Sequence, residues 1–201
     1  MSDHNQHPEQ IIAIAKKLFA EKGFASTTTR ELNSALGITD GLLYYYFPKG
    51  NQQLLDTILE QTDDDCLAAI DISFAHSPYL ASLEVNVIQV ITAIWHRLTD
   101  SGPVYELFIT IREYQHLNKH AVDWISNSFA KLTARFANEL KQVSWLTLNS
   151  TENDVVADMI VTLCRASIEN TLLLTENRHL SPRLADRLKN QIHVILSRSV
   201  R

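Results

Sequence analysis

The stretch TTTRELNSALGITDGLLYYYF, residues 27–47, decides the fold of this 201-residue chain. Threonine is a residue type that caps helices, and Thr28 and Thr39 each precede a short helix-compatible run. Gly37 lies between these runs and can adopt the left-handed conformation that a tight turn needs. The stretch therefore predicts two short helices, at 28–35 and 39–47, that meet at a turn.

Three consecutive tyrosines, Tyr44 to Tyr46, lie at the end of the second short helix. They cannot all face one core, because a helix turns once every 3.6 residues or so. A tyrosine hydroxyl can bond a phosphate oxygen while its ring packs on the protein. Two helices that cross at a turn, with such groups on the second, are typical of a helix-turn-helix that enters the DNA major groove. The alternative is an aromatic core segment at a helix end.

The rest of the chain reads as helix. Five glycines and five prolines are too few for a loop-rich or all-β protein, and no segment has the alternation of a strand. We expect an all-α fold of about nine helices, at 8–22, 28–35, 39–47, 49 onward, 78–99, 103–115, 119–145, 152–176 and 182–197. Residues 1–48 would form a three-helix DNA-binding domain, and 49–201 a larger helical effector-binding and dimerisation domain.

Charge argues for weak non-specific DNA binding. The net charge is −5, and residues 1–50 carry five basic and five acidic side chains. Because the phosphate contribution needs several Lys or Arg contacts, a second reading stays open: a helix-turn-helix protein that acts mainly through protein contacts. No apolar run of about 18 residues and no signal-peptide core occurs, so we expect a cytoplasmic protein with no membrane span.

Catalytic and metal-binding patterns are lacking. No nucleophile–base set, phosphate loop or paired carboxylates rise above chance, and His116 and His120 lack supporting ligands. We therefore expect no enzyme activity, no metal and no cofactor. Cys66 and Cys164 are interpreted as two buried thiols, with a disulfide or a redox sensor as the alternative.

Residues 8–60 resemble the N-terminal domain of the TetR family of bacterial transcriptional repressors. The resemblance rests on Gly23-Phe24, on the threonines before the first short helix, on ALGIT at 35–39 and on GLLYYYF at 41–47. The segment FPKGNQQLL, 47–55, resembles a subgroup similar to LmrA and YxaF. The family implies a ligand-released dimer on a palindromic operator.

The family's DNA-contacting positions correspond here to Thr28, Thr39, Asp40, Gly41, Leu42, Tyr44, Tyr45 and Tyr46, to which we add Arg30 and Lys49. Two departures occur. The lysine that usually starts the fourth helix is absent, and only Lys49 could replace it. Asp40 stands where the family often has a lysine or another polar residue; an acid repels phosphate but can accept from cytosine N4.

Large apolar side chains and a few polar ones suggest a pocket for an unidentified apolar or aromatic small molecule. Its expected lining is Trp95, His96, Phe108, Arg112, Trp124 and Arg165. The alternative is a packed core. The helix from 49 would be the only covalent link through which this pocket acts on the DNA-binding domain.

Apolar stripes on the last two helices are either core or the interface of a homodimer, and the family resemblance favours an interface. The expected interface residues are Val156, Met159, Ile160, Leu163, Leu188, Ile192 and Ile195.

Overall fold

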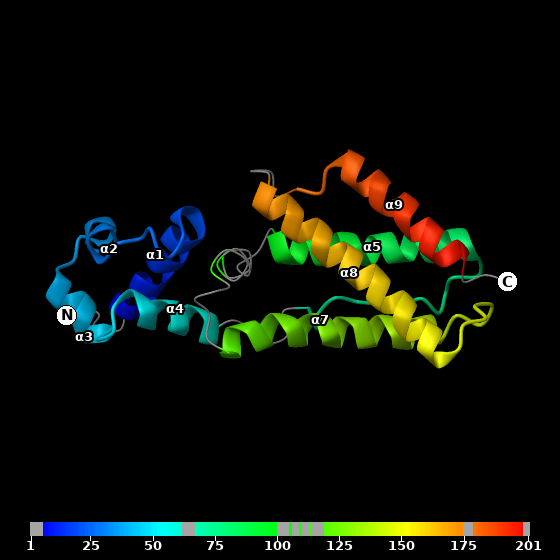
Figure 1. Ribbon diagram of the computed structural model, residues 1–201, viewed down its shortest axis with the longest axis horizontal. Helices are drawn as coiled ribbons and strands as arrows, with labels where there is room; N and C mark the ends of the chain where they lie inside the picture. The colour runs from blue at the N-terminus through cyan, green and yellow to red at the C-terminus, as the bar shows by residue number, and fades with distance from the viewer. Residues whose placement is uncertain are drawn as a thin grey trace. The chain divides into compact units, whose positions relative to one another are not determined.

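The structure is a computed structural model that describes residues 6–61, 67–99, 105, 109, 113, 119–174 and 179–198. Every regular element in these ranges is a helix, which confirms the all-α prediction. The helices are α1 (Gln6–Lys22), α2 (Thr29–Leu36), α3 (Asp40–Tyr46), α4 (Asn51–Glu60), α5 (Leu80–Thr99), α7 (Lys119–Leu140), α8 (Ser150–Leu174) and α9 (Pro182–Ser197) (Figure 1). The helix expected at 103–115 lies mostly outside the described residues; Tyr105 and Ile109 are helical.

Several helix ends differ from the prediction, and a contact in the structure accounts for two of them. Helix α7 ends at Leu140 rather than at Trp145, whose indole Nε1 donates to the backbone oxygen of Ser77 instead. Helix α8 begins earlier than expected because Asn149 forms a capping box with Glu152. The Asn149 side chain accepts from the Glu152 N–H at 2.9 Å, and the Glu152 carboxylate accepts from the Asn149 N–H at 2.8 Å.

The chain divides into two compact units, and the boundary differs from the predicted one at residue 48. The first unit comprises residues 1–63 and 102–124, and the second comprises 64–101 and 125–201. Helix α4 belongs to the first unit because Leu54, Leu55 and Ile58 are at most 2% exposed in the core that α1 also forms. The chain therefore passes between the units at 63–64, 101–102 and 124–125, so the expectation that α4 is the only covalent link is wrong.

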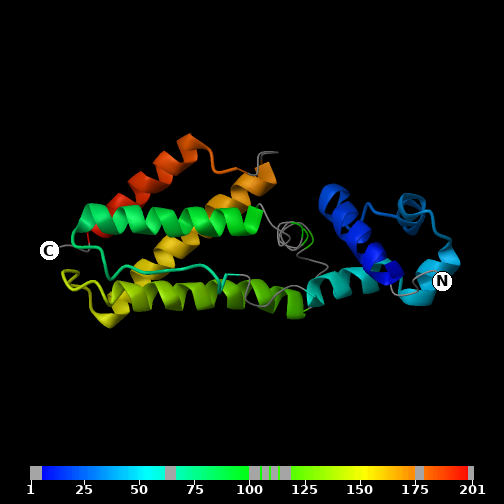
Figure 2. The same cartoon turned by 180° about the vertical axis from the view of Figure 1, so that it is seen from behind.

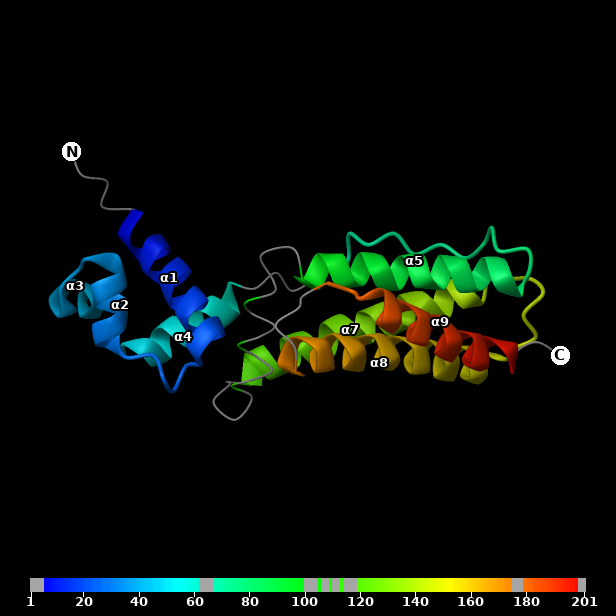
Figure 3. The ribbon, with the colours of Figure 1, turned by 90° about the horizontal axis from the view of Figure 1, so that it is seen from above.

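The core of the first unit joins α1, α2, α3 and α4 (Figure 3). Leu32 of α2 and Leu43 of α3 are fully buried against α1, where Phe19 is also fully buried. Ile109 completes this core from a distant part of the sequence. The two short helices are thus held by burial of one apolar side each, since helices of this length are marginal in isolation.

In the second unit, α9 packs against α5 and α8 (Figure 1). The segment before α5 runs beside α7 (Figure 2). Arg135 donates to the backbone oxygens of Leu67 and Ile70, and the Glu139 carboxylate accepts from the Phe74 N–H at 3.2 Å. Within the described ranges, no helix is both long and apolar enough to span a bilayer.

Candidate nucleic-acid interface

A capping box starts α2 at Thr28, as the sequence indicated. The Thr28 hydroxyl oxygen accepts from the Glu31 N–H at 3.2 Å, and the Glu31 carboxylate accepts from the Thr28 N–H at 3.0 Å. The Thr28 N–H, and then Lys22 at 3.0 Å, lower the pKa of the Glu31 carboxyl. The start of α2 therefore has a fixed backbone, with the adjoining Arg30 side chain exposed.

The turn between α2 and α3 depends on Gly37. Its φ is +65°, in the left-handed region, and its N–H donates to the backbone oxygen of Asn33. No heavy atom lies within 4 Å of the position that a Cβ would take, so the backbone angle alone calls for glycine. This confirms the predicted role of Gly37.

The tyrosines of α3 diverge in their exposure. Tyr45 is 75% exposed and Tyr44 is 46% exposed, whereas Tyr46 packs partly against the core. The rings of Tyr45 and Tyr46 meet edge to face, with centroids 5.0 Å apart. The alternative of an aromatic core segment therefore holds for Tyr46 and Phe47, whereas Tyr44 and Tyr45 lie outside the core.

Tyr44 lies over the turn that leads into α4. Gly50 has a φ of +60°, and a Cβ there would come within 3.3 Å of the Tyr44 Cε1 atom. Gly50 is the N-cap of α4 and supplies no side-chain cap, while the Lys49 side chain is exposed. Asn51 fixes the start of α4 by donating to the backbone oxygen of Thr27. The Tyr44 ring and the start of α4 thus lie close together on the first unit.

An inter-helix hydrogen bond that the sequence did not reveal joins α2 to α3. The Asn33 Nδ2 donates to the Asp40 Oδ1. Asn33 is only 8% exposed, and its Oδ1 has no hydrogen-bond partner among the described residues. The feature of the sequence that could have indicated this bond is a polar residue, Asn33, next to Leu32 on the inner side of a short amphipathic helix. Asp40 itself is exposed at the first position of α3.

The ten predicted DNA-binding residues come from the start of α2, from α3 and from the turn before α4. Leu42 and Tyr46 are partly buried, and the others are exposed: Thr28, Arg30, Thr39, Asp40, Gly41, Tyr44, Tyr45 and Lys49. A Cβ at Gly41 would meet only the Thr39 Oγ1, at 3.9 Å, so packing within the protein does not demand a glycine there. The Gly41 backbone is open to close approach from outside.

The predicted effector pocket stays a prediction, because only three of its six residues have described side chains. Trp95 is fully buried in the core of the second unit, whereas the next residue, His96, is exposed, because successive helix residues point about 100° apart. The Arg165 guanidinium lies 5.6 Å from the Phe129 ring centroid and 3.6 Å from the Glu169 carboxylate. Phe108, Arg112 and the Trp124 side chain lie outside the described residues.

Four of the seven predicted interface residues are core residues, which corrects the prediction. Val156, Ile160, Leu188 and Ile192 are at most 7% exposed within the single chain. They lie on the inner side of α8 and α9, where α9 packs on α8 and on α5. Met159 is 48% exposed, and Leu163 and Ile195 are partly exposed, so these three remain available to a partner.

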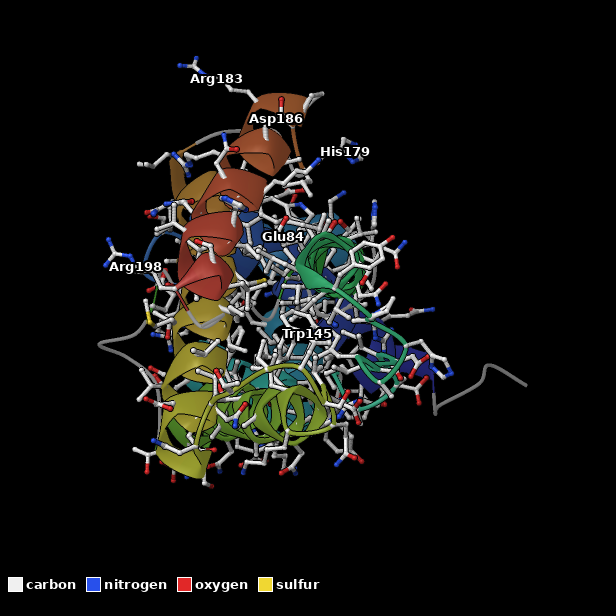
Figure 4. The ribbon with its side chains drawn as sticks, turned by 90° about the vertical axis from the view of Figure 1, so that its right-hand side faces the viewer. Glu84, Trp145, His179, Arg183, Asp186 and Arg198 are labelled. Carbon is white, nitrogen blue, oxygen red and sulfur yellow. The ribbon has the colours of Figure 1, made fainter. Side chains whose placement is uncertain are left out.

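An open groove of about 1140 Å³ runs between the outward sides of α8 and α9. Its apolar lining includes Met159, Leu163, Val194 and Ile195. Arg183 and Asp186 lie at the end of the groove where α9 begins, as Figure 4 shows. The groove thus has an apolar floor with charged groups at one end.

The described part of the chain contains neither a reactive cysteine nor a cluster of metal-ligating side chains. Burial raises the pKa of the Cys164 thiol to about 12, which keeps it protonated and unreactive. Cys66 lies outside the described residues. Among the residues that the structure describes, no group of three His, Cys, Asp or Glu side chains could hold a metal ion.

Comparison with known proteins places the strongest similarity in the first unit. Residues 11–58 match the model of the family described as bacterial regulatory proteins, tetR family. The chain is 45% identical over 51 residues to the uncharacterized HTH-type transcriptional regulator YerO of Bacillus subtilis, covering 25% of this chain and 17% of that protein. It is 39% identical over 56 residues to the HTH-type transcriptional repressor KstR2 of Rhodococcus jostii, covering 28% of this chain and 27% of that protein. The chain therefore matches about a quarter or less of the length of these relatives.

Solved structures resemble the whole chain in fold. A transcriptional regulator of the TerR/AcrR family from Aquifex aeolicus has a TM-score of 0.61 at 18% identity, covering 93% of this chain and 98% of that one. GusR of Salmonella enterica has a TM-score of 0.59 at 16% identity, covering 98% of both chains. A TetR transcriptional regulator from Legionella pneumophila has a TM-score of 0.58 at 16% identity, covering all of both chains.

Proposed function

We propose that this protein is a transcriptional regulator of the TetR type, acting as a repressor, that binds operator DNA through α2, α3 and the start of α4. The observation that carries the proposal is the two-sided character of α3. Leu43 and Phe47 anchor one side in the core, while Tyr44 and Tyr45 stand exposed on the other. The family match over 11–58 and the repressor relative support it. Membership of the subgroup similar to LmrA and YxaF stays a prediction.

Each exposed group has a distinct contact to make with DNA. The α3 residues from Thr39 to Tyr45 enter the major groove, and the Tyr44 hydroxyl donates to a phosphate oxygen near the start of α4. Arg30 and Lys49 supply the cations of the predicted contact set. A dimer would bring about four such cations, so the logarithm of affinity would fall with the logarithm of salt with a slope of only about −4.

The protein would act as a homodimer on a palindromic site, with the outward sides of α8 and α9 as the interface. The exposed Met159 and the partly exposed Leu163 and Ile195 line the groove there and would be covered by a second copy. Two-fold symmetry would place the two α3 helices in successive major grooves, roughly 34–36 Å apart.

An apolar or aromatic small molecule bound in the second unit would release the DNA. The route of coupling follows the chain: residues 102–124 belong to the first unit and continue directly from α5 and into α7. A ligand that favours one arrangement of α5 and α7 would therefore bias the packing of Ile109 in the first core. We place this activity in the cytoplasm, where operator DNA is accessible.

The alternative is a regulator that acts mainly through protein contacts and binds DNA weakly. The balanced charge of residues 1–50 favours it. A selection of duplexes from a random pool with the full-length protein separates the two. Operator binding predicts enrichment of one palindrome, and protein-mediated action predicts none.

A matched pair of variants tests the interface itself. Tyr45→Ala removes a ring that is 75% exposed on α3, whereas Tyr79→Ala removes one that is 61% exposed in the second unit. We expect Tyr45→Ala to weaken binding to the selected duplex and Tyr79→Ala to leave it unchanged. Equal affinity of both variants and the unaltered protein would contradict the proposed interface.

A further inference from the structure

We infer that Asn33 is a positioning residue, which holds the Asp40 carboxylate so that Asp40 accepts a hydrogen bond from the exocyclic amino group of one cytosine in each half-site. The inference rests on the proposed operator binding and adds to it a base preference and the residue that sets it. It follows from the hydrogen bond between Asn33 of α2 and Asp40 of α3, and from the donor and acceptor atoms that each base presents in the major groove.

The contact leaves half of the carboxylate free. Asn33 donates from Nδ2 to the Asp40 Oδ1, and Asn33 is 8% exposed whereas Asp40 is exposed. Among the contacts of the described residues, the Asp40 carboxylate has no ion pair and no hydrogen bond other than the one from Asn33. The second oxygen of Asp40 is therefore available to a donor outside the protein.

The amide of Asn33 has only one orientation that suits this carboxylate. Turning it over would place the Asn33 Oδ1 against the Asp40 oxygen, and two acceptors would repel. In the favourable orientation the Asn33 Oδ1 is buried without a partner, which is destabilising. An apolar residue at position 33 would avoid that loss. The fold alone therefore does not explain Asn33, whereas a fixed Asp40 does.

The chemistry of a carboxylate at the major-groove face of α3 selects cytosine. An ionised carboxylate accepts but cannot donate. Guanine and thymine present only acceptor atoms in the major groove, and adenine presents an acceptor, N7, beside its amino group. Cytosine presents its N4 amino donor and has no acceptor atom beside it in the major groove. A free carboxylate would also swing toward repelling phosphates, so restraint by Asn33 lowers the ordering cost of the base contact.

The experiment measures base preference rather than affinity alone. Selection from a random duplex pool with the full-length protein gives the half-site, and duplexes with single base changes are then compared by fluorescence anisotropy at one salt concentration. We expect one cytosine per half-site whose replacement weakens binding about 5- to 30-fold, the lower part of the range for a specific base contact. Asp40→Ala should abolish that discrimination and raise the affinity for random DNA, because it removes a negative charge.

Asn33→Leu should reduce the cytosine discrimination while thermal unfolding occurs at an equal or higher temperature. In an Asp40→Ala background the same change should leave the affinity for the selected duplex unchanged, whereas a merely structural role of Asn33 predicts a loss of affinity in that background as well. Glu60→Ala is the charge-matched control, because Glu60 is exposed at the far end of α4 and should leave the base preference unchanged. Asn33→Ala serves if the leucine variant does not fold.

Three outcomes overturn the inference, and they are distinguishable. If the unaltered protein enriches no sequence, the proposed operator binding fails and the inference fails with it. If it enriches a palindrome whose preferences persist in Asp40→Ala, operator binding stands and Asp40 is not the reader. If Asp40→Ala loses the preference but neither Asn33 variant does, Asn33 does not position Asp40.

Discussion

Glu113 provides a sharp test of how a later part of the sequence supports the first unit, which carries the proposed DNA-binding surface. Its carboxylate accepts a hydrogen bond from the Phe24 N–H at 2.9 Å, across 89 positions of sequence. Glu113 is 9% exposed. The bond fixes the loop between α1 and α2, where the Phe24 ring meets Phe19 edge to face with centroids 5.3 Å apart.

The change Glu113→Ala removes the acceptor and leaves the Phe24 N–H without a protein partner. A hydrogen bond to a charged group contributes about 1.5–3 kcal/mol, and we expect the free energy of unfolding of the first unit to fall by that amount. Glu113→Gln keeps a side-chain oxygen but loses the charge, so about half of the loss is expected. The order of stability should therefore be Glu, then Gln, then Ala.

Hydrogen exchange of the Phe24 amide is the most direct assay, because two units need not unfold together. If the amide opens and closes many times before it exchanges, the exchange rate reports the free energy of opening. A loss of 1.5–3 kcal/mol then corresponds to roughly 10- to 150-fold faster exchange. Chemical denaturation followed by circular dichroism gives the matching change in stability. Unchanged exchange at Phe24 together with unchanged stability in Glu113→Ala would refute the assigned role of this bond.

Three further outcomes are expected. Tyr44→Phe removes only the hydroxyl and should weaken operator binding by about 0.5–1.5 kcal/mol in a titration at fixed salt, whereas Tyr79→Phe should not; equal affinities would remove Tyr44 from the phosphate contacts. Leu163→Lys places a charge in the α8–α9 groove and should convert the dimer to a monomer in light scattering, unlike Val85→Lys on the exposed side of α5; a persistent dimer would place the interface elsewhere. The pKa of the Glu31 carboxyl is lower in the folded protein than its ordinary 4.5, so its contribution to stability is present above that pH and is lost as pH falls through the lower value. The stability of Glu31→Gln should consequently depend less on pH below 4.5, and parallel curves for the two proteins would contradict the linkage.

Local pattern was sufficient to predict the helix-turn-helix. The Thr28 cap, the left-handed Gly37 and the buried side formed by Leu32, Leu43 and Phe47 depend on neighbours within a few positions. The same holds for the last helix, whose bounds at 182–197 agree with the structure because Ser181 caps it directly before Pro182. Such features are set by hydrogen bonds and sterics that the adjacent residues already define.

The sequence did not show what covers the apolar side of each helix. An amphipathic stripe predicts that one side of a helix is covered, and it does not distinguish the chain's own core from a second copy. Ile160, Leu188 and Ile192 therefore looked like interface residues and are core. Likewise, Trp95 and His96 are neighbours in sequence but differ in burial.

The sequence by itself thus determined which segments form helices and which two of them form a helix-turn-helix, because these depend on short-range backbone geometry. Tertiary structure alone decided that residues 102–124 belong to the first compact unit, that Glu113 bonds the Phe24 N–H and that Asn33 bonds Asp40. The physical reason is that these contacts form only when helices pack, and packing depends on the fit of whole surfaces rather than on the spacing of residues along one helix.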